Sequence, residues 1–337
     1  MAGLAVLGSG TVASYPSVHK IMLPTTLEDT VELPAGWRSV RYAVDAPVPD
    51  DALDASVLVV WGNGRREMLD AAARMPRLRW VASLAAGTEV VQECFPGVVV
   101  TSGSGLHDGP VAEHTLALVL ACVRSLPSLV RAQDVRRWAG ELGGIQPVHD
   151  EQVRTLHGAH VLIWGFGSIA ARLAPLLTAL GASVTGVARS AGTRPGTDAT
   201  GAPAGSFAVV TEADLPRVLP QTDVVVDLLP ATPATRHAVS SAVLAALPPR
   251  AFVVNVGRGA TLDEDALLDA VDAGRLAGAA LDVTAREPLP PDSPLWAQPR
   301  ILISPHAAGG RPQHAGAFLT RALAAWSAGA PLPNLVS

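Results

Sequence analysis

The sequence predicts an α/β protein with two doubly wound parallel sheets, one of them in a domain inserted into the other domain. Its 337 residues exceed what one small hydrophobic core can hold, so two domains are expected. Its composition, 49% apolar and 16% charged, is typical of an ordered chain with a large buried core. From His160 onward, short apolar runs alternate with helical stretches, which is the pattern of βαβ units.

The first hundred residues alternate short strands with helices. Apolar runs bounded by turn residues are typical of buried parallel strands, and they occupy residues 21–23, 57–60, 80–83 and 98–100. A helix is predicted over residues 65–74. Ser102, Gly103, Ser104 and Gly105 then form a flexible joint.

One long apolar helix is predicted over residues 111–130. It is too apolar for a single buried face, so we expect it at a domain boundary or a dimer interface. Later strands are predicted at residues 161–164, 183–187, 224–228, 252–255, 278–281 and 301–304. Helices are predicted over 168–180, over 263–273 with Asp263 as the N-cap, and over 313–328.

The last helix is expected to return to the first domain. Residues 1–104 and 306–337 then form one domain, and residues 105–305 form the domain inserted into it.

Charge and cysteine content exclude several classes of protein. A net charge of −5, with arginines in isolated pairs, argues against nucleic acid as a partner. Cys94 and Cys122 are the only cysteines, too few for a disulfide framework or a zinc site, so a reducing, cytoplasmic location is expected and no metal. Residues 2–7 lack the basic start of a signal peptide. The apolar stretch at 116–123 is far short of the roughly 20 residues that span a bilayer.

A glycine-rich loop joins the strand at 161–164 to the following helix. Its residues are Gly165, Phe166, Gly167, Ser168, Ile169 and Ala170. In a dinucleotide-binding fingerprint the first glycine makes a tight turn, the second lets the backbone approach a pyrophosphate, and the third position needs a small residue. The amides of Ser168 and Ile169 open the helix and can face phosphates. An ordinary glycine-rich turn is the alternative, and the flanking strand and helix argue against it.

The end of the second strand of this domain indicates which cofactor is used. Ala188 stands where an acid would bond the ribose 2′-hydroxyl of NAD(H), and Arg189 and Ser190 follow, with Arg194 nearby. Arginine and serine can bind a 2′-phosphate, so NADP(H) is the preferred cofactor. If Arg189 only stacks on the adenine, NAD(H) is also accepted.

Arg258, Glu287 and His306 each follow a short β-like run near the end of the chain. A cation, an acid and a histidine at the carboxyl edge of a nucleotide-binding sheet indicate hydride transfer on a small oxo acid. Each residue alone is better explained as a loop cation, a surface charge or a packed histidine, so only the combination argues for catalysis.

From about Pro24 to Val336 the chain resembles the D-isomer-specific 2-hydroxyacid dehydrogenases, in particular those that reduce glyoxylate and hydroxypyruvate. The resemblance is carried by the loop at Gly165, by Leu228-Leu229-Pro230 with Thr235, by residues 255–259, by Asp282 with residues 287–290, and by residues 305–309. It implies a Rossmann domain inserted into a flavodoxin-like substrate domain, and a homodimer.

The resemblance also implies roles for individual residues. His306 would be the acid and base, Glu287 would orient it and keep it protonated, and Arg258 would bind the substrate carboxylate. Asp282 would bond the nicotinamide carboxamide, and the amides of Ala86 and Gly87 would receive the substrate carboxylate. An alanine at position 85 would be strained there if the loop required a positive φ. The remaining cofactor contacts implied are Leu229, Pro230, Thr235, Val256, Gly257 and Gly309.

Two other functions remain open. Phosphite dehydrogenases keep the arginine, glutamate and histidine, whereas formate dehydrogenases pair the histidine with glutamine, so Glu287 argues against formate. A cofactor-sensing protein similar to the C-terminal-binding corepressors shares the fold and the motifs. His114 is predicted to pack in the long helix and to do no chemistry, and Trp138 to pack in the core or on the surface unless it reaches a partner's active site.

Overall fold

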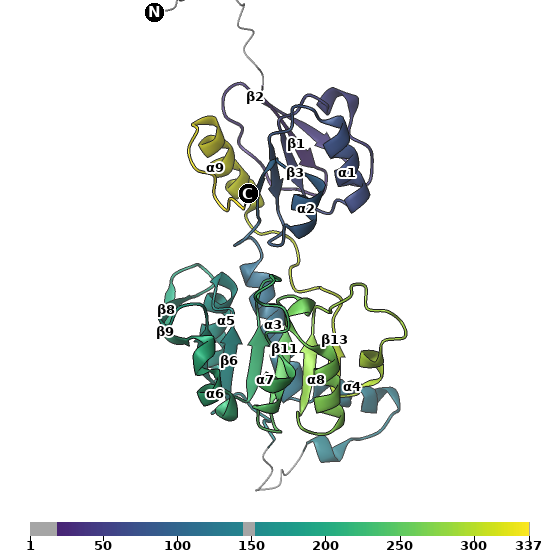
Figure 1. Ribbon diagram of the computed structural model, residues 1–337, viewed down its shortest axis with the longest axis vertical. Coiled ribbons are helices and arrows are strands. Elements are labelled where there is room, and N and C mark those ends of the chain that lie inside the picture. Colours follow the sequence, from purple (N-terminus) through teal and green to yellow (C-terminus); the bar gives the residue numbers. More distant parts are fainter. Residues whose placement is uncertain (1–18, 144–151, 337) are drawn as a thin grey trace, which may run out of the picture. The chain divides into compact units, whose positions relative to one another are not determined.

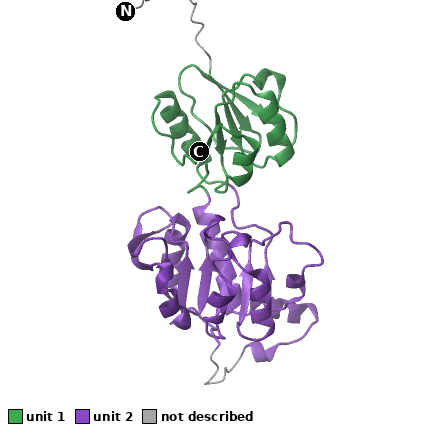
Figure 2. Ribbon diagram, in the orientation of Figure 1, with its two compact units in different colours: residues 1–106, 312–337 green, residues 107–311 purple. Residues whose placement is uncertain are grey.

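The computed structural model describes residues 19–143 and 152–336 (Figure 1). Residues 2–7, which bear on the signal-peptide expectation, lie outside this range. The chain forms two compact units: unit 1 is Met1–Leu106 with Pro312–Ser337, and unit 2 is His107–Arg311 (Figure 2). The expected boundaries after residues 104 and 305 lie slightly earlier along the chain.

The sheet of unit 1 has five parallel strands in the order β2-β1-β3-β4-β5, which is the flavodoxin-like order. Its strands are β1 (His19–Pro24), β2 (Trp37–Tyr42), β3 (Val57–Val60), β4 (Trp80–Ser83) and β5 (Val99–Thr101). The sequence analysis missed β2. Half of the side chains of this edge strand are exposed and interrupt its apolar residues, so it contains no apolar run.

Helices cover both faces of this sheet. One face packs on α1 (Arg65–Arg74) and α2 (Glu89–Cys94), through residues such as Met68 and Val91. The other face packs on α9 (Ala315–Ser327), through Phe318 and Leu319. The C-terminal segment therefore completes the first unit, as the sequence predicted. A short 3-10 helix, η1 (Asp50–Ala52), lies between β2 and β3 along the chain.

The sheet of unit 2 has eight strands in the order β13-β12-β11-β10-β6-β7-β9-β8. Its strands are β6 (His160–Trp164), β7 (Ser183–Val187), β8 (Gly192–Thr197), β9 (Pro203–Val210), β10 (Val224–Asp227), β11 (Phe252–Asn255), β12 (Gly278–Leu281) and β13 (Ile301–Ile303). All pairings are parallel except β8 with β9. Strand order reverses between β6 and β10, which is where α/β sheets bind ligands.

The β8–β9 hairpin was not predicted. The segment Gly-Thr-Arg-Pro-Gly-Thr of β8 is rich in turn residues, and its pairing shifts register between Pro195 and Thr197. Such an edge strand depends on its partner strand for its conformation, and local sequence preference gives no sign of it.

The prediction of one continuous helix over residues 111–130 is wrong. The segment is broken into α3 (Asp108–Val123) and α4 (Leu126–Asp134), whose axes differ by 68°. Ser125 takes a left-handed φ of 55° and Pro127 begins the next turn, so the i→i−4 ladder stops there.

The other helices of unit 2 lie on both faces of the sheet. They are α5 (Ser168–Ala179), α6 (Leu215–Val218), α7 (Ser241–Ala245) and α8 (Glu264–Asp272), with 3-10 helices η2 (Gly140–Leu142), η3 (Glu212–Asp214), η4 (Leu219–Gln221), η5 (Gly259–Thr261) and η6 (Pro294–Ala297). The predicted N-cap is confirmed, because the Asp263 carboxylate accepts a bond from the amide of Ala266. Over the described residues no single helix meets the length and apolarity needed to cross a membrane, although the bent pair α3 and α4 meets them when taken together.

Candidate active site

The predicted site residues of unit 2 gather at one edge of its sheet. Because the strands are parallel and adjacent, their carboxyl ends meet at that edge. The loop of Gly165 follows β6, Leu229 follows β10, Arg258 follows β11, Asp282 follows β12 and His306 follows β13.

His306 and Glu287 form a pair. His306 Nδ1 lies 2.8 Å from Glu287 Oε2, and both side chains are partly exposed, at 49% and 39%. The other carboxylate oxygen of Glu287 accepts a 3.1 Å bond from the amide of Thr284, which fixes the acid on its own loop. With Nδ1 engaged, Nε2 is the ring nitrogen left to exchange a proton with a substrate.

The backbone of His306 is held by Asp282. The His306 amide donates to the Asp282 carbonyl at 2.7 Å. The Asp282 carboxylate accepts bonds from the amides of Ala307 at 2.8 Å and Ala308 at 3.1 Å, and from Ser304 Oγ at 2.5 Å. His306 has a left-handed φ of 52°, a conformation that costs energy and persists because these bonds fix it.

His114 takes part in the same network, which the sequence analysis missed. Its Nε2 lies 3.1 Å from Ser304 Oγ and 3.2 Å from Asp282 Oδ1. The motif Glu113-His114 on an apolar helix gave the only signal, because a polar side chain there needs a partner. Asp282 is 2% exposed and its oxygens accept several protein donors, so its implied contact with a nicotinamide carboxamide stays a prediction.

Arg258 lies on a loop whose backbone is firmly bonded. Its Nη1 donates to the Gly257 carbonyl at 2.7 Å, and its own carbonyl accepts from Asn255 Nδ2 at 3.1 Å. Asn255 Oδ1 accepts from the amide of Gly257 at 3.0 Å, so this buried amide side chain fixes both ends of the turn.

The glycine-rich loop has the local structure expected of a pyrophosphate site. Gly165 has a φ of +99°, which favours glycine. A Cβ at Gly167 would meet nothing within 4 Å, so this face of the loop is open to a ligand. Ala170 is fully buried where α5 packs on the sheet, and the first-turn amides of α5, including those of Ser168 and Ile169, lack partners within the helix.

Leu228 and Leu229 touch two glycine loops. A Cβ at Gly165 would lie 2.8 Å from the carbonyl carbon of Leu228, and one at Gly257 would lie 2.6 Å from the carbonyl oxygen of Leu229. The three loops therefore pack backbone against backbone.

The remaining predicted cofactor residues on these loops are engaged by the protein or buried. Thr235 donates from Oγ1 to the Pro230 carbonyl at 2.6 Å, Val256 is 7% exposed, and the Gly309 carbonyl lies 2.7 Å from His107 Nδ1. Their contacts with a cofactor stay predictions.

Arg194 joins the residues at the end of β7. From the β8–β9 hairpin its Nη1 donates to the Phe166 carbonyl at 3.0 Å and its Nη2 to Ser190 Oγ at 3.2 Å. It thus ties the glycine-rich loop to Ser190, while Arg189 and Ser190 are exposed. Sequence spacing placed Arg194 nearby, and only the unpredicted hairpin explains how it reaches both partners.

An acid also contacts the glycine-rich loop. Asp108, the first residue of α3, forms a hydrogen bond with the Ser168 side chain. Burial raises the pKa of Asp108, and the bond to Ser168 opposes that rise. A carboxyl beside a phosphate-binding turn is unexpected, and no sequence motif pointed to it.

The predicted substrate loop belongs to unit 1, after β4. The amide of Ala85 donates to Ser83 Oγ at 3.2 Å, and its carbonyl accepts from Gly103 at 2.7 Å. Neither Ala85 nor Ala86 has a positive φ. The backbone strain considered for an alanine at position 85 is therefore absent from this part of the described chain. The substrate contacts of Ala86 and Gly87 stay predictions.

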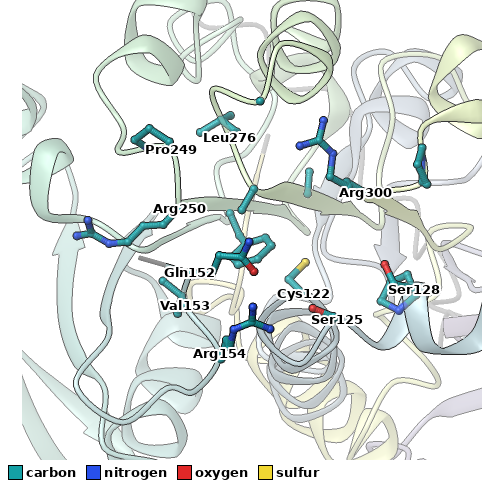
Figure 3. A pocket seen from close by; sticks show the side chains of 16 residues that line it. Cys122, Ser125, Ser128, Gln152, Val153, Arg154, Pro249, Arg250, Leu276 and Arg300 are labelled. Atoms are coloured by element: carbon teal, nitrogen blue, oxygen red, sulfur yellow. The ribbon is translucent and has the colours of Figure 1, made fainter. Parts of the chain in front are cut away.

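A cavity of about 400 Å³ lies at the opposite ends of the strands (Figure 3). Its wall includes Cys122 and Ser125 near the α3–α4 break, together with Phe252, the first residue of β11. Two arginines of its rim are used by the protein: Arg250 Nε donates to Asp223 Oδ1 at 2.6 Å, and Arg300 donates to the Val271 carbonyl. This cavity therefore lies away from the sheet edge that bears the predicted site residues. Within the described ranges, no group of three or more His, Cys, Asp or Glu side chains could hold a metal ion.

Comparison with known proteins agrees with this geometry. Residues 116–308 match the model of the NAD binding domain of D-isomer specific 2-hydroxyacid dehydrogenases, which is more than half of the chain. The chain belongs to this family. It contains the family's NAD binding domain, and its two units have the α/β architecture that the sequence predicted.

Individual relatives resemble the chain to different extents. The chain is 37% identical over 175 residues to the glyoxylate/hydroxypyruvate reductase A of Salmonella newport, and the match covers 52% of this chain and 53%, about half, of that protein. A family member from Aeromonas salmonicida has a TM-score of 0.76 at 27% identity, covering 95% of this chain and 99% of that one. The NADPH-dependent glyoxylate/hydroxypyruvate reductase of Sinorhizobium meliloti, solved with NADP and sulfate, has a TM-score of 0.73 at 25% identity, covering 94% and 98%.

Replacing Asp282 by Asn is expected to loosen the His306 loop. In the variant, an NH₂ group replaces one carboxylate oxygen and faces a backbone N–H. That N–H loses its charged hydrogen-bond acceptor. We expect the free energy of unfolding to fall by about 2–3 kcal/mol and the amides of Ala307 and Ala308 to exchange at least about tenfold faster. Urea denaturation and hydrogen exchange measure both. Ser304→Ala is the matched control, since it removes one neutral donor and is expected to cost about 1 kcal/mol. Equal, small effects of the two variants would show that Asp282 does not support the loop.

Proposed function

We propose that this dehydrogenase is an NADPH-preferring reductase of small 2-oxo acids, such as glyoxylate or hydroxypyruvate, yielding the D-2-hydroxy acid. The observation that carries the proposal is the 2.8 Å pair of His306 and Glu287, at the sheet edge that also bears Arg258 and the glycine-rich loop. The Salmonella and Sinorhizobium relatives are reductases of this class by name, which supports the same substrates here.

His306 acts as the acid and base. In reduction its Nε2 gives a proton to the carbonyl oxygen of the oxo acid, and in the reverse direction neutral Nε2 removes the hydroxyl proton. Glu287 holds the ring through Nδ1 and stabilises the imidazolium. Nε2 is therefore the ring nitrogen that faces the substrate.

Arg258 binds the substrate carboxylate. A guanidinium stays charged at all working pH values, and its planar fork matches the two oxygens of a carboxylate. Nη1 is already held by Gly257, which limits the rotation of the side chain and presents its other N–H groups in one direction. Arg258 therefore orients the carbonyl of the oxo acid for reaction at a single face.

Bound NADPH would supply the hydride, and the residues at the edge of the sheet suit it. The open side of Gly167 and the first-turn amides of α5 suit a pyrophosphate. Arg189 and Ser190 at the end of β7, with Arg194 bonded to Ser190, suit a ribose 2′-phosphate. A relative from Xanthobacter autotrophicus, 28% identical over 95% of this chain with a TM-score of 0.73, was solved with NADPH and MES, which supports this preference.

We also propose that the protein is a cytoplasmic homodimer. Apolar side chains are exposed along α4 and just beyond it, where Val130 is 56%, Val135 71% and Trp138 96% exposed. A second copy would cover these residues, since such a patch is unusual on a monomer. The two free, buried cysteines suit a reducing compartment.

Purified protein is expected to oxidise NADPH in the presence of glyoxylate or hydroxypyruvate, and His306→Asn to lower kcat by about 10³-fold, because the proton donor is lost. The measurement is absorbance at steady state over a panel of 2-oxo acids, with phosphite and NADP⁺ as a separate arm. His314→Asn is the control, because His314 also has a left-handed φ, 58° against 52°, and asparagine tolerates it. Retention of most turnover by His306→Asn would exclude the proposal, and phosphite-dependent turnover alone would change the substrate.

Arg189→Gln is expected to raise KM for NADPH by about tenfold and to leave KM for NADH nearly unchanged, since a charge-assisted bond to the 2′-phosphate is lost. Both constants come from steady-state assays with the best oxo acid. Arg217→Gln is the control, an exposed arginine elsewhere in unit 2. A similar rise with both cofactors would mean that Arg189 stacks on the adenine and does not select NADPH.

Val130→Asp is expected to give monomers at concentrations where the wild-type protein is a dimer, because a buried charge would be unpaired at the interface. Light scattering after size exclusion reads the mass directly. Leu69→Asp, at a side chain 47% exposed on α1, is the matched control and is expected to leave the dimer intact. A monomeric wild-type protein would contradict the assignment of this patch.

A further inference from the structure

Asp227 is a buried acid that the proposed mechanism leaves without a role. It is the last residue of β10 and is 0% exposed. Its Oδ1 accepts a 2.9 Å bond from the amide of Leu229, on the loop predicted to contact the cofactor. Its backbone carbonyl accepts from the amide of Val256 at 3.0 Å. Asp227 therefore lies between two loops of the site.

The second oxygen of Asp227 contacts a threonine that is also fully buried. Thr261 Oγ1 lies 2.5 Å from Asp227 Oδ2 and 2.6 Å from the backbone carbonyl oxygen of Arg258. Oxygens this close together are favourable neighbours only when a proton lies between them. A threonine hydroxyl has one proton, and a carbonyl has none. The second proton must come from Asp227.

The resulting chain has one consistent direction. Asp227 Oδ2 donates to Thr261 Oγ1, and Thr261 Oγ1 donates to the Arg258 carbonyl. If Asp227 were ionised, Thr261 could donate to only one of its two neighbours, and two acceptor oxygens would face each other without a proton between them. The geometry thus favours the carboxylic acid form of Asp227.

The surroundings of Asp227 favour the same form. Burial raises its pKa from 3.8 to about 6. The neighbouring strand ends present Trp164 and Asn255, which are uncharged. The loop of residues 256–261 carries one charged side chain, Arg258, and its Nη1 is bonded to Gly257. No charged group within the described chain contributes to the shift.

The far end of the chain is the backbone of Arg258. That carbonyl also accepts from the Thr261 amide at 3.1 Å and from Asn255 Nδ2 at 3.1 Å. A third bond at 2.6 Å from the Thr261 hydroxyl fixes the peptide next to the guanidinium-bearing Cα. When Asp227 loses its proton, Thr261 turns toward the carboxylate and the Arg258 carbonyl loses this bond.

We propose that Asp227 is a positioning residue of the reductase, a neutral carboxylic acid whose proton, relayed through Thr261, fixes the Arg258 loop for binding the substrate carboxylate. This inference rests on the proposed function. It predicts that KM for the oxo acid rises with pH as Asp227 ionises.

Two variants of Asp227 and Thr261 separate this role from simple packing. Asp227→Asn keeps a donor for Thr261 and an acceptor for Leu229 at every pH. Thr261→Val keeps the volume and removes the hydroxyl. We expect the rise in KM for glyoxylate between about pH 5 and about pH 8 to be about tenfold smaller in Asp227→Asn than in the wild type. Thr261→Val should raise KM by about fivefold with kcat within about threefold, and Thr261→Ser should restore it.

A readout without turnover tests the proton itself. The infrared difference between the wild type and Asp227→Asn should show the carbonyl stretch of a protonated acid at about pH 5, weakening by about pH 8. Absence of that band, or an unchanged pH response of KM in Asp227→Asn, would overturn the proposal. If no oxo acid is turned over by any of the proteins, the proposed function fails, and the infrared band still decides the state of Asp227.

Discussion

Short polar side chains at the ends of three adjacent strands hold the candidate site together. Asp227, Asn255 and Asp282 end or follow β10, β11 and β12, and all are buried. The first two accept the amide two residues further on, and the third accepts two amides of the His306 loop. Each loop therefore leaves its strand in a fixed direction. The rigidity of the sheet edge therefore extends to the loops. The predicted catalytic side chains need few further contacts to hold their positions.

The sequence predicted most of the parallel strands, because buried strands are apolar runs bounded by turn residues. It also predicted the Glu287–His306 pair. Each of these residue types is common, but the order in which they occur along the chain is uncommon. Edge elements were missed. β2 and the β8–β9 hairpin expose about half of their side chains, and pairing with a neighbour, not local preference, gives them strand conformation. The break at Ser125 was missed because the apolar pattern continues across it, although Pro127 marks it in the sequence.

The supporting residues of the site were also beyond the sequence. His114 and Thr261 are ordinary choices in a helix and a 3-10 turn, and their partners are 168 and 34 residues away along the chain. Only the fold brings them to Asp282 and Asp227. Reasoning from spacing finds groups that do chemistry, because they lie on strand ends with known motifs. It does not find groups that hold those side chains, because distance along the chain says nothing of contact.

The backbone contact of Gly165 and Gly257 with Leu228 and Leu229 limits how this enzyme can be redesigned. A methyl group at either glycine would collide with a main chain, not with a side chain that can turn away. Saturation libraries directed at these two positions would therefore spend most of their members on chains that cannot close these loops. Libraries meant to keep the fold should leave both glycines unchanged.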